Sequence, residues 1–194
     1  MKKALSLFVI GSMLFLPLTS YKCSEEQVLA KDNTNSREYV CMPCGSSCDN
    51  SVYSIPGTCQ HCNMKLVEKS TVVFNKVEPE VLCSFIDSTG EKNILLLDVR
   101  SAEEFEGRAE EKFGSLRNAV NIPVQELERR INELEKYKNK EIIVYCSHSH
   151  RSPRASYMLN QNGFKHVTNL EGGMSVWKDR VKEENCNKKL FLQQ

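Results

Sequence analysis

Short apolar runs alternate with amphipathic segments through the second half of the chain. The apolar runs are rich in β-branched and aliphatic residues and predict strands over 71–74, 94–99, 141–145 and 166–170. Between them, apolar residues recur every three or four positions among charged residues, which predicts helices over 81–87 and 124–134 and a third beginning near Ser152. This alternation predicts an α/β fold with a parallel sheet, right-handed crossovers and helices on both faces.

The amino-terminal pattern is different. Met1-Lys2-Lys3 precede an uncharged run over 4–18, and the small residues Thr19-Ser20 follow. This order is typical of a secretory signal peptide, which we expect over residues 1–22. The run is short for a membrane span, which needs about 20 residues. We therefore expect export across the inner membrane, to the periplasm or cell envelope of a bacterium.

Cys23 lies directly after the expected signal peptide and raises the possibility of a lipoprotein. Acylation of Cys23 would tether the mature chain to the membrane, and the polar segment after it suits a flexible tether. Ser20-Tyr21-Lys22 stand where a lipobox has aliphatic and small residues, which argues against it. Both a tethered and an untethered protein stay open.

Charge composition limits the partners. The 194 residues include 26 Lys and Arg against 25 Asp and Glu, a net charge of +1. Loss of residues 1–22 removes three lysines and no acidic residue, so the formal charge of the mature chain becomes −2. No basic patch emerges, and we expect no nucleic-acid partner. The rest of the chain is long enough for one α/β domain and a small module.

The strand over 141–145 leads to Cys146, which opens a short polar loop ending at Arg151. In open α/β sheets, chemistry takes place at the carboxyl ends of strands. Helix amino termini and nearby cations favour the thiolate form of a cysteine, and Arg151 or a protonated His148 or His150 can supply the charge. The pattern predicts a nucleophilic Cys146 in an anion-binding loop; a buried structural cysteine is the alternative.

The chain resembles the rhodanese family over most of positions 70–180. The matching segments, in family order, are 95–100 ending in Asp-Val-Arg, Glu104-Phe105, 114–123 ending in Asn-Ile-Pro, the Cys146 loop, Gly163-Phe164, Val167, Leu170, Gly172-Gly173 and Trp177. The resemblance implies that Cys146 takes sulfur from a small donor such as thiosulfate, holds it as a persulfide and passes it to a thiol or cyanide-like acceptor. It implies no cofactor for this transfer.

The resemblance also implies roles for the loop. Arg151 would steer the donor anion and close the loop. Backbone amides would hold the bound sulfur, with these substrate-binding residues: Ser147, His148, Ser149, His150 and Ser152. Four residues separate Cys146 from Arg151, the spacing of the family's sulfurtransferases, whereas its phosphatases have one more. Asp98 and Arg100 are expected to form a structural ion pair.

One position departs from the family. Many members carry glycine where this chain has Ser149, so Ser149 must either adopt an ordinary conformation or be strained at positive φ. The loop also lacks the lysine or arginine that several members have at its second or third position. His148 and His150 can replace such fixed cations with charges that switch near pH 6.5, or they are simply solvated loop residues.

A second group of cysteines precedes the α/β domain. Two Cys-x-x-Cys pairs, Cys41/Cys44 and Cys59/Cys62, have fourteen residues between them, close to the spacing of a four-cysteine zinc site. The surrounding residues resemble a small heavy-metal-binding domain of bacterial envelope and metal-efflux proteins, although Cys44 and Asn63 replace that family's histidine and glycine. A zinc-ribbon-like module is therefore expected, with zinc or another thiophilic metal.

The alternative for this module is a disulfide framework, which a secreted location allows. Cys48 is the odd thiol, because five cysteines cannot all pair within the module. His61 can be a solvated turn residue. Thiol-disulfide exchange through Cys41 and Cys44 is a weaker possibility, since no βαβ unit surrounds them.

The domain organisation follows. We expect a signal peptide over 1–22, a linker over 23–38, the cysteine module over 39–70, the rhodanese-like domain over 71–180 and a polar tail over 181–194. Cys83 is expected in the core and Cys186 in a dangling tail, with a resolving thiol as the alternative. The leading function is envelope sulfur transfer; the rival is a non-catalytic metal-binding or thiol-sensing protein.

Overall fold

The structure is a computed structural model that describes residues 37–42 and 47–194. The expected signal peptide, Cys23, Cys44 and nearly all of the expected linker lie outside the described residues. In the part of the chain that is described, every helix is too short or too polar to cross a bilayer.

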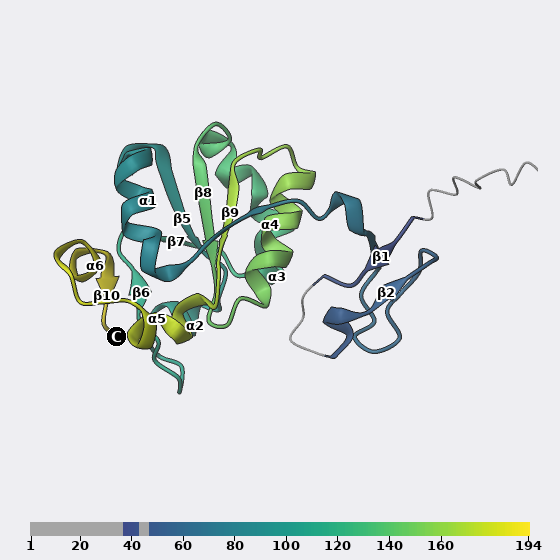
Figure 1. Cartoon of the computed structure of the whole chain (residues 1–194), viewed down its shortest axis with the longest axis horizontal. Coiled ribbons are helices and arrows are strands. Elements are labelled where there is room, and N and C mark those ends of the chain that lie inside the picture. Colours follow the sequence, from purple (N-terminus) through teal and green to yellow (C-terminus); the bar gives the residue numbers. More distant parts are fainter. Residues whose placement is uncertain (1–36, 43–46) are drawn as a thin grey trace, which may run out of the picture. The chain divides into compact units, whose positions relative to one another are not determined.

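The described elements follow the chain in the order shown in Figure 1. The strands are β1 (Tyr39–Val40), β2 (Val52–Tyr53), β3 (Val67–Glu68), β4 (Asn75–Val77), β5 (Ile94–Asp98), β6 (Ser115–Leu116), β7 (Val120–Asn121), β8 (Glu141–Tyr145), β9 (Val167–Leu170) and β10 (Phe191–Leu192). The α-helices are α1 (Leu82–Thr89), α2 (Ala102–Phe105), α3 (Val124–Arg130), α4 (Arg151–Gln161), α5 (Trp177–Arg180) and α6 (Asn185–Leu190). The 3-10 helices are η1 (Ser47–Asn50), η2 (Lys69–Thr71), η3 (Pro79–Val81), η4 (Glu91–Asn93), η5 (Ile131–Tyr137) and η6 (Gly173–Val176).

A five-stranded sheet forms the centre of the larger domain. Its order is β4-β9-β8-β5-β7, and all of its strand pairs are parallel. Parallel neighbours require crossover connections, which the helices between the strands supply. The predicted α/β fold with a parallel sheet is confirmed.

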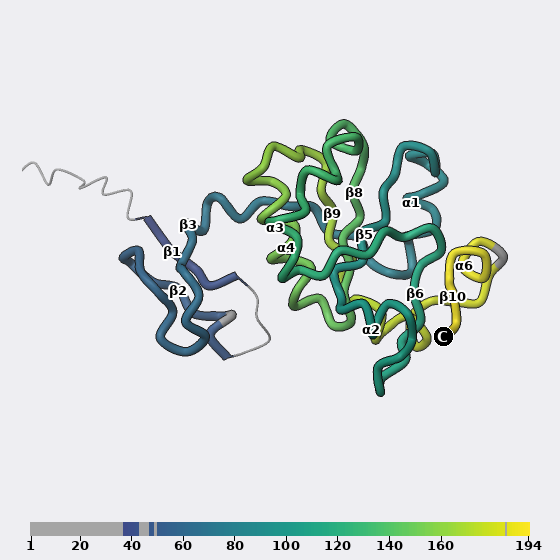
Figure 2. The backbone as a smooth tube through the Cα atoms, turned by 180° about the vertical axis from the view of Figure 1, so that it is seen from behind, coloured from purple at the N-terminus to yellow at the C-terminus, as the bar shows by residue number. Residues whose placement is uncertain are grey.

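Each face of the sheet buries a separate core. Alternate residues of β8 point to opposite faces, so Ile142 and Val144 pack under α3 and α4, whereas Ile143 and Tyr145 pack under α1, η6 and α5. Figure 2 shows α3 and α4 on one side of β5, β8 and β9 and α1 on the other. This two-sided burial explains why residues 94–97 of β5 and 142–145 of β8 are continuous runs without charge in the sequence.

Two expectations about secondary structure are corrected. The strand expected over 71–74 is not formed; β4 begins at Asn75, and Val73 is 68% exposed. Only Val77 of β4 is buried, so pairing with β9 outweighs the β propensity of the preceding residues. The single helix expected over 124–134 is α3 followed by η5, although the apolar residues of this segment are buried as expected.

The carboxyl-terminal segment is folded, and the expectation of a dangling tail is wrong. Cys186 of α6 forms a disulfide with Cys83 of α1. β10 pairs antiparallel with β6, and Phe191 stacks on Trp177 with ring centroids 5.9 Å apart. The disulfide joins residues 103 apart in the sequence, and Leu190 of α6 and Phe191 of β10 pack against the core of the domain.

The cysteine-rich segment forms a small antiparallel sheet in the order β2-β1-β3. A turn between Thr58 and Lys65 carries Cys59 and Cys62. Asn63 has φ of 57° in this turn, and asparagine tolerates that conformation better than most residues, so it can stand where the resembling family has glycine.

Candidate active site

Cys146 lies directly after β8, at the carboxyl end of the sheet, and is 1% exposed. Its Sγ is 3.5 Å from Oγ of Ser152, which is fully buried in the first turn of α4. The first N–H groups of a helix have no partner within the helix and favour negative charge nearby. The thiol therefore lies between a strand end and a helix amino terminus, as the sequence predicted.

The loop after Cys146 is braced by η6. The N–H groups of Met174 and Ser175 donate to the carbonyl oxygens of Cys146 and Ser147 at 2.9 and 2.8 Å. Gly173 has φ of 65°, and a Cβ there would collide with both carbonyl oxygens. Glycine is required at this close approach, which gives one half of the double-glycine motif its physical reason.

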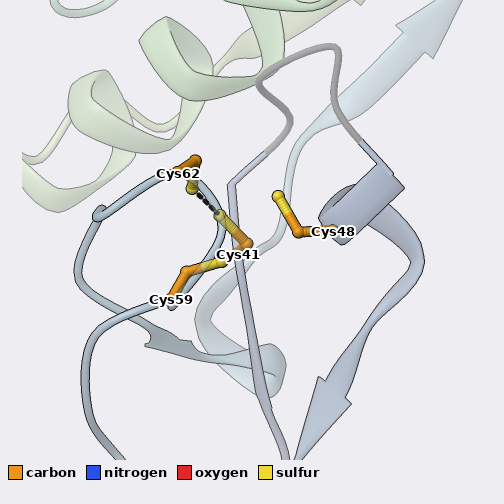
Figure 3. A group of neighbouring side chains, drawn as sticks. All are labelled: Cys41, Cys48, Cys59 and Cys62. Atoms are coloured by element: carbon orange, nitrogen blue, oxygen red, sulfur yellow. Dashed lines mark hydrogen bonds between the residues drawn. The ribbon is translucent and has the colours of Figure 1, made fainter.

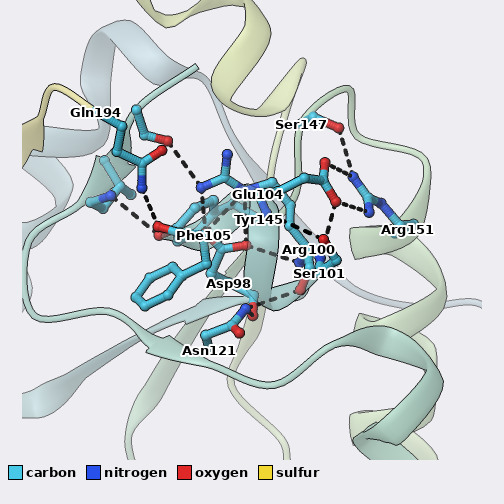
Figure 4. A network of polar contacts seen from close by, with 12 residues as sticks. Asp98, Arg100, Ser101, Glu104, Phe105, Asn121, Tyr145, Ser147, Arg151 and Gln194 are labelled. Carbon is cyan, nitrogen blue, oxygen red and sulfur yellow. Dashed lines mark hydrogen bonds and ion pairs between the residues drawn. The ribbon is translucent and has the colours of Figure 1, made fainter. Parts of the chain in front are cut away.

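Arg151, the first residue of α4, is held by a carboxylate from α2. Its guanidinium donates to both carboxylate oxygens of Glu104 at 2.6 and 2.7 Å and to Oγ of Ser147 at 2.8 Å (Figure 4). Glu104 also accepts from the N–H of Ser101 at 3.0 Å in the predicted capping box. The hydrogen bonds from Arg151 lower the pKa of Glu104 to about 2. Arg151 thus closes the loop, and Glu104 fixes its direction.

This ion pair makes the stability of the domain depend on pH. The pKa of Glu104 lies near 4.5 when unpaired and is lowered to about 2 in the fold, so its contribution is present above pH 4.5 and is lost as the pH falls toward 2. Because the side chains are 23% and 30% exposed, we expect a loss of about 1–3 kcal/mol over this window. Urea unfolding at a series of pH values would measure it.

The matched variants are Glu104→Gln and Glu126→Gln. Glu104→Gln should remove this part of the pH dependence and lower stability at pH 7, whereas Glu126, which pairs with Arg130 at the surface, should matter by less than about 0.5 kcal/mol. Unchanged pH dependence in Glu104→Gln would contradict the assignment.

A second ion pair supports the strand ends. Arg100 donates to Asp98 at 2.7 Å, and both side chains are almost fully buried. Arg100 also donates to the carbonyl oxygen of Gly114 at 2.9 Å, and Asn121 bridges the backbone oxygens of Asp98 and Arg100 at 3.0 Å each (Figure 4). Burial raises the pKa of the neighbouring Tyr145. The expected structural ion pair is present and supports the sheet edge.

The loop residues between Cys146 and Arg151 divide into two groups. Ser147 is buried and turned toward Arg151, and Ser149 has φ of 57°. His148 and His150 are exposed, and their rings stack with centroids 6.3 Å apart. The rings of Phe113 and His148 are perpendicular, with centroids 5.2 Å apart. The imidazoles therefore form an exposed rim on the loop that follows the buried thiol. Of the two alternatives for Ser149, the strained conformation is the one observed.

Sequence reasoning missed two members of this site. Glu104 was recognised only as part of a family motif and as a helix cap, because nothing local indicates a partner 47 residues away. Asn169, which donates to Ser149, lies in a fully buried strand, and an amide side chain within the predicted strand 166–170 was the available signal.

Four cysteines of the small module form a cluster (Figure 3). The sulfur atoms of Cys41, Cys48, Cys59 and Cys62 all lie within 4.8 Å of one another. The predicted ligand Cys44 lies outside the described residues. Cys48, which is not one of the four ligands predicted from the sequence, lies in the cluster with Cys41, Cys59 and Cys62. The first three thiols of the cluster are buried, and Cys62 is half-buried.

The donor set of this cluster suits a thiophilic metal. Tetrahedral zinc with Zn–S bonds of about 2.3 Å holds its sulfurs about 3.8 Å apart, which the cluster allows with small shifts. Backbone hydrogen bonds from Cys62 and His61 lower the pKa of Cys59 to about 6, which is the arrangement a metal-binding Cys-x-x-Cys turn provides. A cysteine cluster able to hold a metal is therefore present.

Comparison with known proteins identifies the larger domain. The family model for the rhodanese-like domain matches residues 84–180. The chain is 38% identical over 93 residues to the uncharacterized protein YqhL of Bacillus subtilis, covering 48% of this chain and 68% of that protein. It is 29% identical over 107 residues to the "Putative thiosulfate sulfurtransferase, mitochondrial" of Schizosaccharomyces pombe, covering 50% and 71%.

Other matches are to larger proteins or to solved structures. The tRNA uridine(34) hydroxylase of Wigglesworthia glossinidia brevipalpis is 34% identical over 121 residues, and the chain spans only 36% of its length. Among solved structures, the rhodanese-related protein of Thermoplasma volcanium is 29% identical with a TM-score of 0.43, covering 55% of this chain and 92% of that one.

Proposed function

The chain belongs to the rhodanese-like family, and from this premise we propose that it is a sulfurtransferase that carries sulfur as a persulfide on Cys146. The observation that carries the proposal is the loop itself. A buried thiol at a strand end faces the amino terminus of α4, and the loop closes after four residues on an arginine fixed by Glu104. Such a small loop has room for one sulfur atom beside the thiol and little for a tetrahedral phosphate.

The proposed reaction has two displacements. The Cys146 thiolate attacks the outer sulfur of thiosulfate, the sulfur–sulfur bond of the donor breaks, and sulfite leaves with the bonding electrons. The resulting persulfide anion is stabilised by loop amides and the helix amino terminus. A thiol or cyanide then attacks the terminal sulfur, and Cys146 leaves as the thiolate. No external oxidant or reductant is needed.

Arg151 orients the donor in this scheme but adds little net charge. Its guanidinium is paired with the Glu104 carboxylate, so the two together are neutral toward an incoming anion. The guanidinium holds Ser147 and thereby the first turn of the loop. The exposed rim of His148 and His150 is where the donor and acceptor would enter.

Intact mass of the reduced protein after thiosulfate treatment tests the proposal. We expect the gain of one sulfur, its removal by cyanide, and its location on the peptide that contains Cys146. No gain on a Cys146 shown to be reduced would contradict thiosulfate transfer. It would favour the second candidate, a metal-binding or thiol-sensing protein that uses this fold as a scaffold, which the cysteine cluster and the lack of lysine or arginine over 147–150 support.

For the cysteine module we propose one zinc ion held by Cys41, Cys48, Cys59 and Cys62. The proximity of the four sulfur atoms supports this set. Cys48→Ser is expected to weaken zinc binding by about 100-fold, because each thiolate carries a large part of the affinity of a structural site. Competition with a chromogenic chelator, with the metal content of the purified protein, would measure it.

Cys44→Ser is the matched comparison, because Cys44 is the fourth ligand that sequence spacing predicts. Retained affinity in Cys44→Ser with loss in Cys48→Ser would support the proposed set. The reverse result would restore the two Cys-x-x-Cys pairs as the ligands.

We also propose that the protein acts outside the cytoplasm, in the periplasm or cell envelope. The disulfide between Cys83 and Cys186 supports this location, since such bonds persist mainly in oxidising compartments. The burial of Cys146 would protect its thiol there. A membrane tether through Cys23 is part of the same proposal and can be tested by mass of the mature amino terminus.

A further inference from the structure

Ser149 has a backbone conformation that an L-residue rarely adopts. Its φ is 57°, and the next residue, His150, has right-handed φ and ψ of −100° and −45°. A left-handed residue next to a right-handed one turns successive backbone N–H groups to the same side and makes a small anion-binding hollow. The conformation of Ser149 therefore shapes the hollow in which, on the proposed function, the persulfide sulfur lies.

Two hydrogen bonds with residues of β9 hold the Ser149 side chain. Its Oγ accepts from Nδ2 of Asn169 at 2.8 Å and donates to the carbonyl oxygen of Leu170 at 3.3 Å. Both partners belong to the end of β9, the neighbour of β8 in the sheet. A rigid strand end thus supports the one strained residue of the loop.

Asn169 is an unusual residue for its surroundings. It is fully buried and pairs in register with Val144 of β8 on one side and with Lys76 of β4 on the other. Its Oδ1 is buried and has no hydrogen-bond partner among the described residues. A buried amide with an unpaired oxygen is costly compared with an apolar side chain, so its one hydrogen bond to Ser149 needs a reason.

We propose that Asn169 is a positioning residue, which keeps Ser149 in the left-handed conformation and so keeps the amide hollow around the sulfur of Cys146 formed before substrate arrives. The inference rests on the proposed sulfur transfer and adds a residue to it. Most L-residues would relax from this conformation, whereas glycine adopts it without strain. We call the hydrogen bond from Asn169 to Ser149 the Ser149 clamp. This clamp compensates for the absence of glycine at position 149 of the loop.

The test compares Asn169→Ala in two parents, wild type and Ser149→Gly. In the wild-type parent we expect sulfur loading from thiosulfate to slow by about tenfold, the effect of one lost buried hydrogen bond on the reacting state. In the Ser149→Gly parent the same change should slow loading by less than about twofold, because glycine has no side chain to clamp and needs no support. Equal losses in both parents would overturn the proposal.

Asn162→Ala is the matched control. Asn162 also makes one side-chain hydrogen bond, to the carbonyl oxygen of Met158 at 2.8 Å, but it lies exposed at the end of α4. The Asn162→Ala protein should load sulfur at the same rate as wild type. A tenfold loss in Asn162→Ala would show that loading responds to general destabilisation, and the clamp would fail.

Thermal unfolding separates this inference from the proposed function. The fall in melting temperature caused by Asn169→Ala should be clearly smaller in the Ser149→Gly parent, and this needs no sulfur chemistry. If wild type fails to load sulfur but the changes in melting temperature are non-additive, sulfur transfer from thiosulfate is contradicted and the clamp is supported. If the changes in melting temperature are additive, the clamp is contradicted whatever the loading rates show.

Discussion

A Cys146→Ser protein is expected to take up no sulfur from thiosulfate, with a loss of at least roughly 1,000-fold in the transfer rate. A serine hydroxyl in the same place is a far weaker nucleophile at neutral pH and cannot hold a sulfane sulfur as a persulfide. The fold should be unaffected, because Cys146 is buried in a small space that oxygen fills with little change. Oγ of Ser152, which lies 3.5 Å from Sγ of Cys146, can hydrogen-bond to a sulfur or to an oxygen in that position.

The same variant tests whether the two modules act independently. The content of bound metal should equal that of wild type in Cys146→Ser, whereas Cys59→Ser should lose the metal and retain sulfur loading. Rates of thiocyanate formation with thiosulfate and cyanide, together with metal analysis of both proteins, would measure this. Equal loss of loading in Cys59→Ser would show that the cysteine module takes part in the transfer, and residual loading in Cys146→Ser would place the reacting thiol elsewhere.

The position of Cys146 could be predicted because local sequence determines it. An uncharged run of four strand residues, 142–145, favours burial on both faces of a sheet, and the polar loop with Ser152-Pro153 then signals a strand end followed by a helix. The strand expected over 71–74 failed because its β-branched residues have the propensity but no neighbour to cover them. Pairing with β9 selects Asn75–Val77 instead.

The partners of the loop could not be predicted in this way. Glu104 and Arg151 meet because β5 and β8 are neighbours, so that α2 and α4 begin at the same edge of the sheet. The contact between Asn169 and Ser149 depends likewise on β8 lying next to β9. Strand order is a property of the whole fold, and a single sequence gives only the elements.

Cysteine connectivity was the other limit. Spacing favoured Cys44 as a ligand, which stays a prediction because Cys44 lies outside the described residues, and it did not place Cys48 in the cluster or give a reason to join Cys83 to Cys186. The polar composition of 181–194 suggested a loose end, but Val181 and Phe191 supply enough apolar surface to pack on Trp177. A few apolar positions in a charged segment outweighed its average composition.

Loss of the Cys83–Cys186 disulfide is expected to lower the stability of the larger domain by about 2–5 kcal/mol. The bond closes a loop between residues 103 apart, so it strongly restricts the unfolded chain. It also holds α6 next to α1, and thereby keeps β10 paired with β6. For a domain of this size the loss corresponds to a fall in melting temperature of roughly 10 °C.

Urea unfolding with and without a reductant would measure this loss, with Cys83→Ala/Cys186→Ala as the matched control. The double variant should be as unstable as the reduced wild type and should not respond to reductant, which separates this bond from the thiols of the cysteine cluster. Mass spectrometry would show that the disulfide of the reduced wild type is broken. If this protein unfolded at the same urea concentration as the oxidised protein, the stabilising role of the disulfide would be refuted. Phe191 of β10 stacks on Trp177, which directly follows η6, the helix that braces the Cys146 loop. We therefore also expect reduction to slow sulfur loading. The increase in activation free energy should be smaller than the loss in free energy of unfolding.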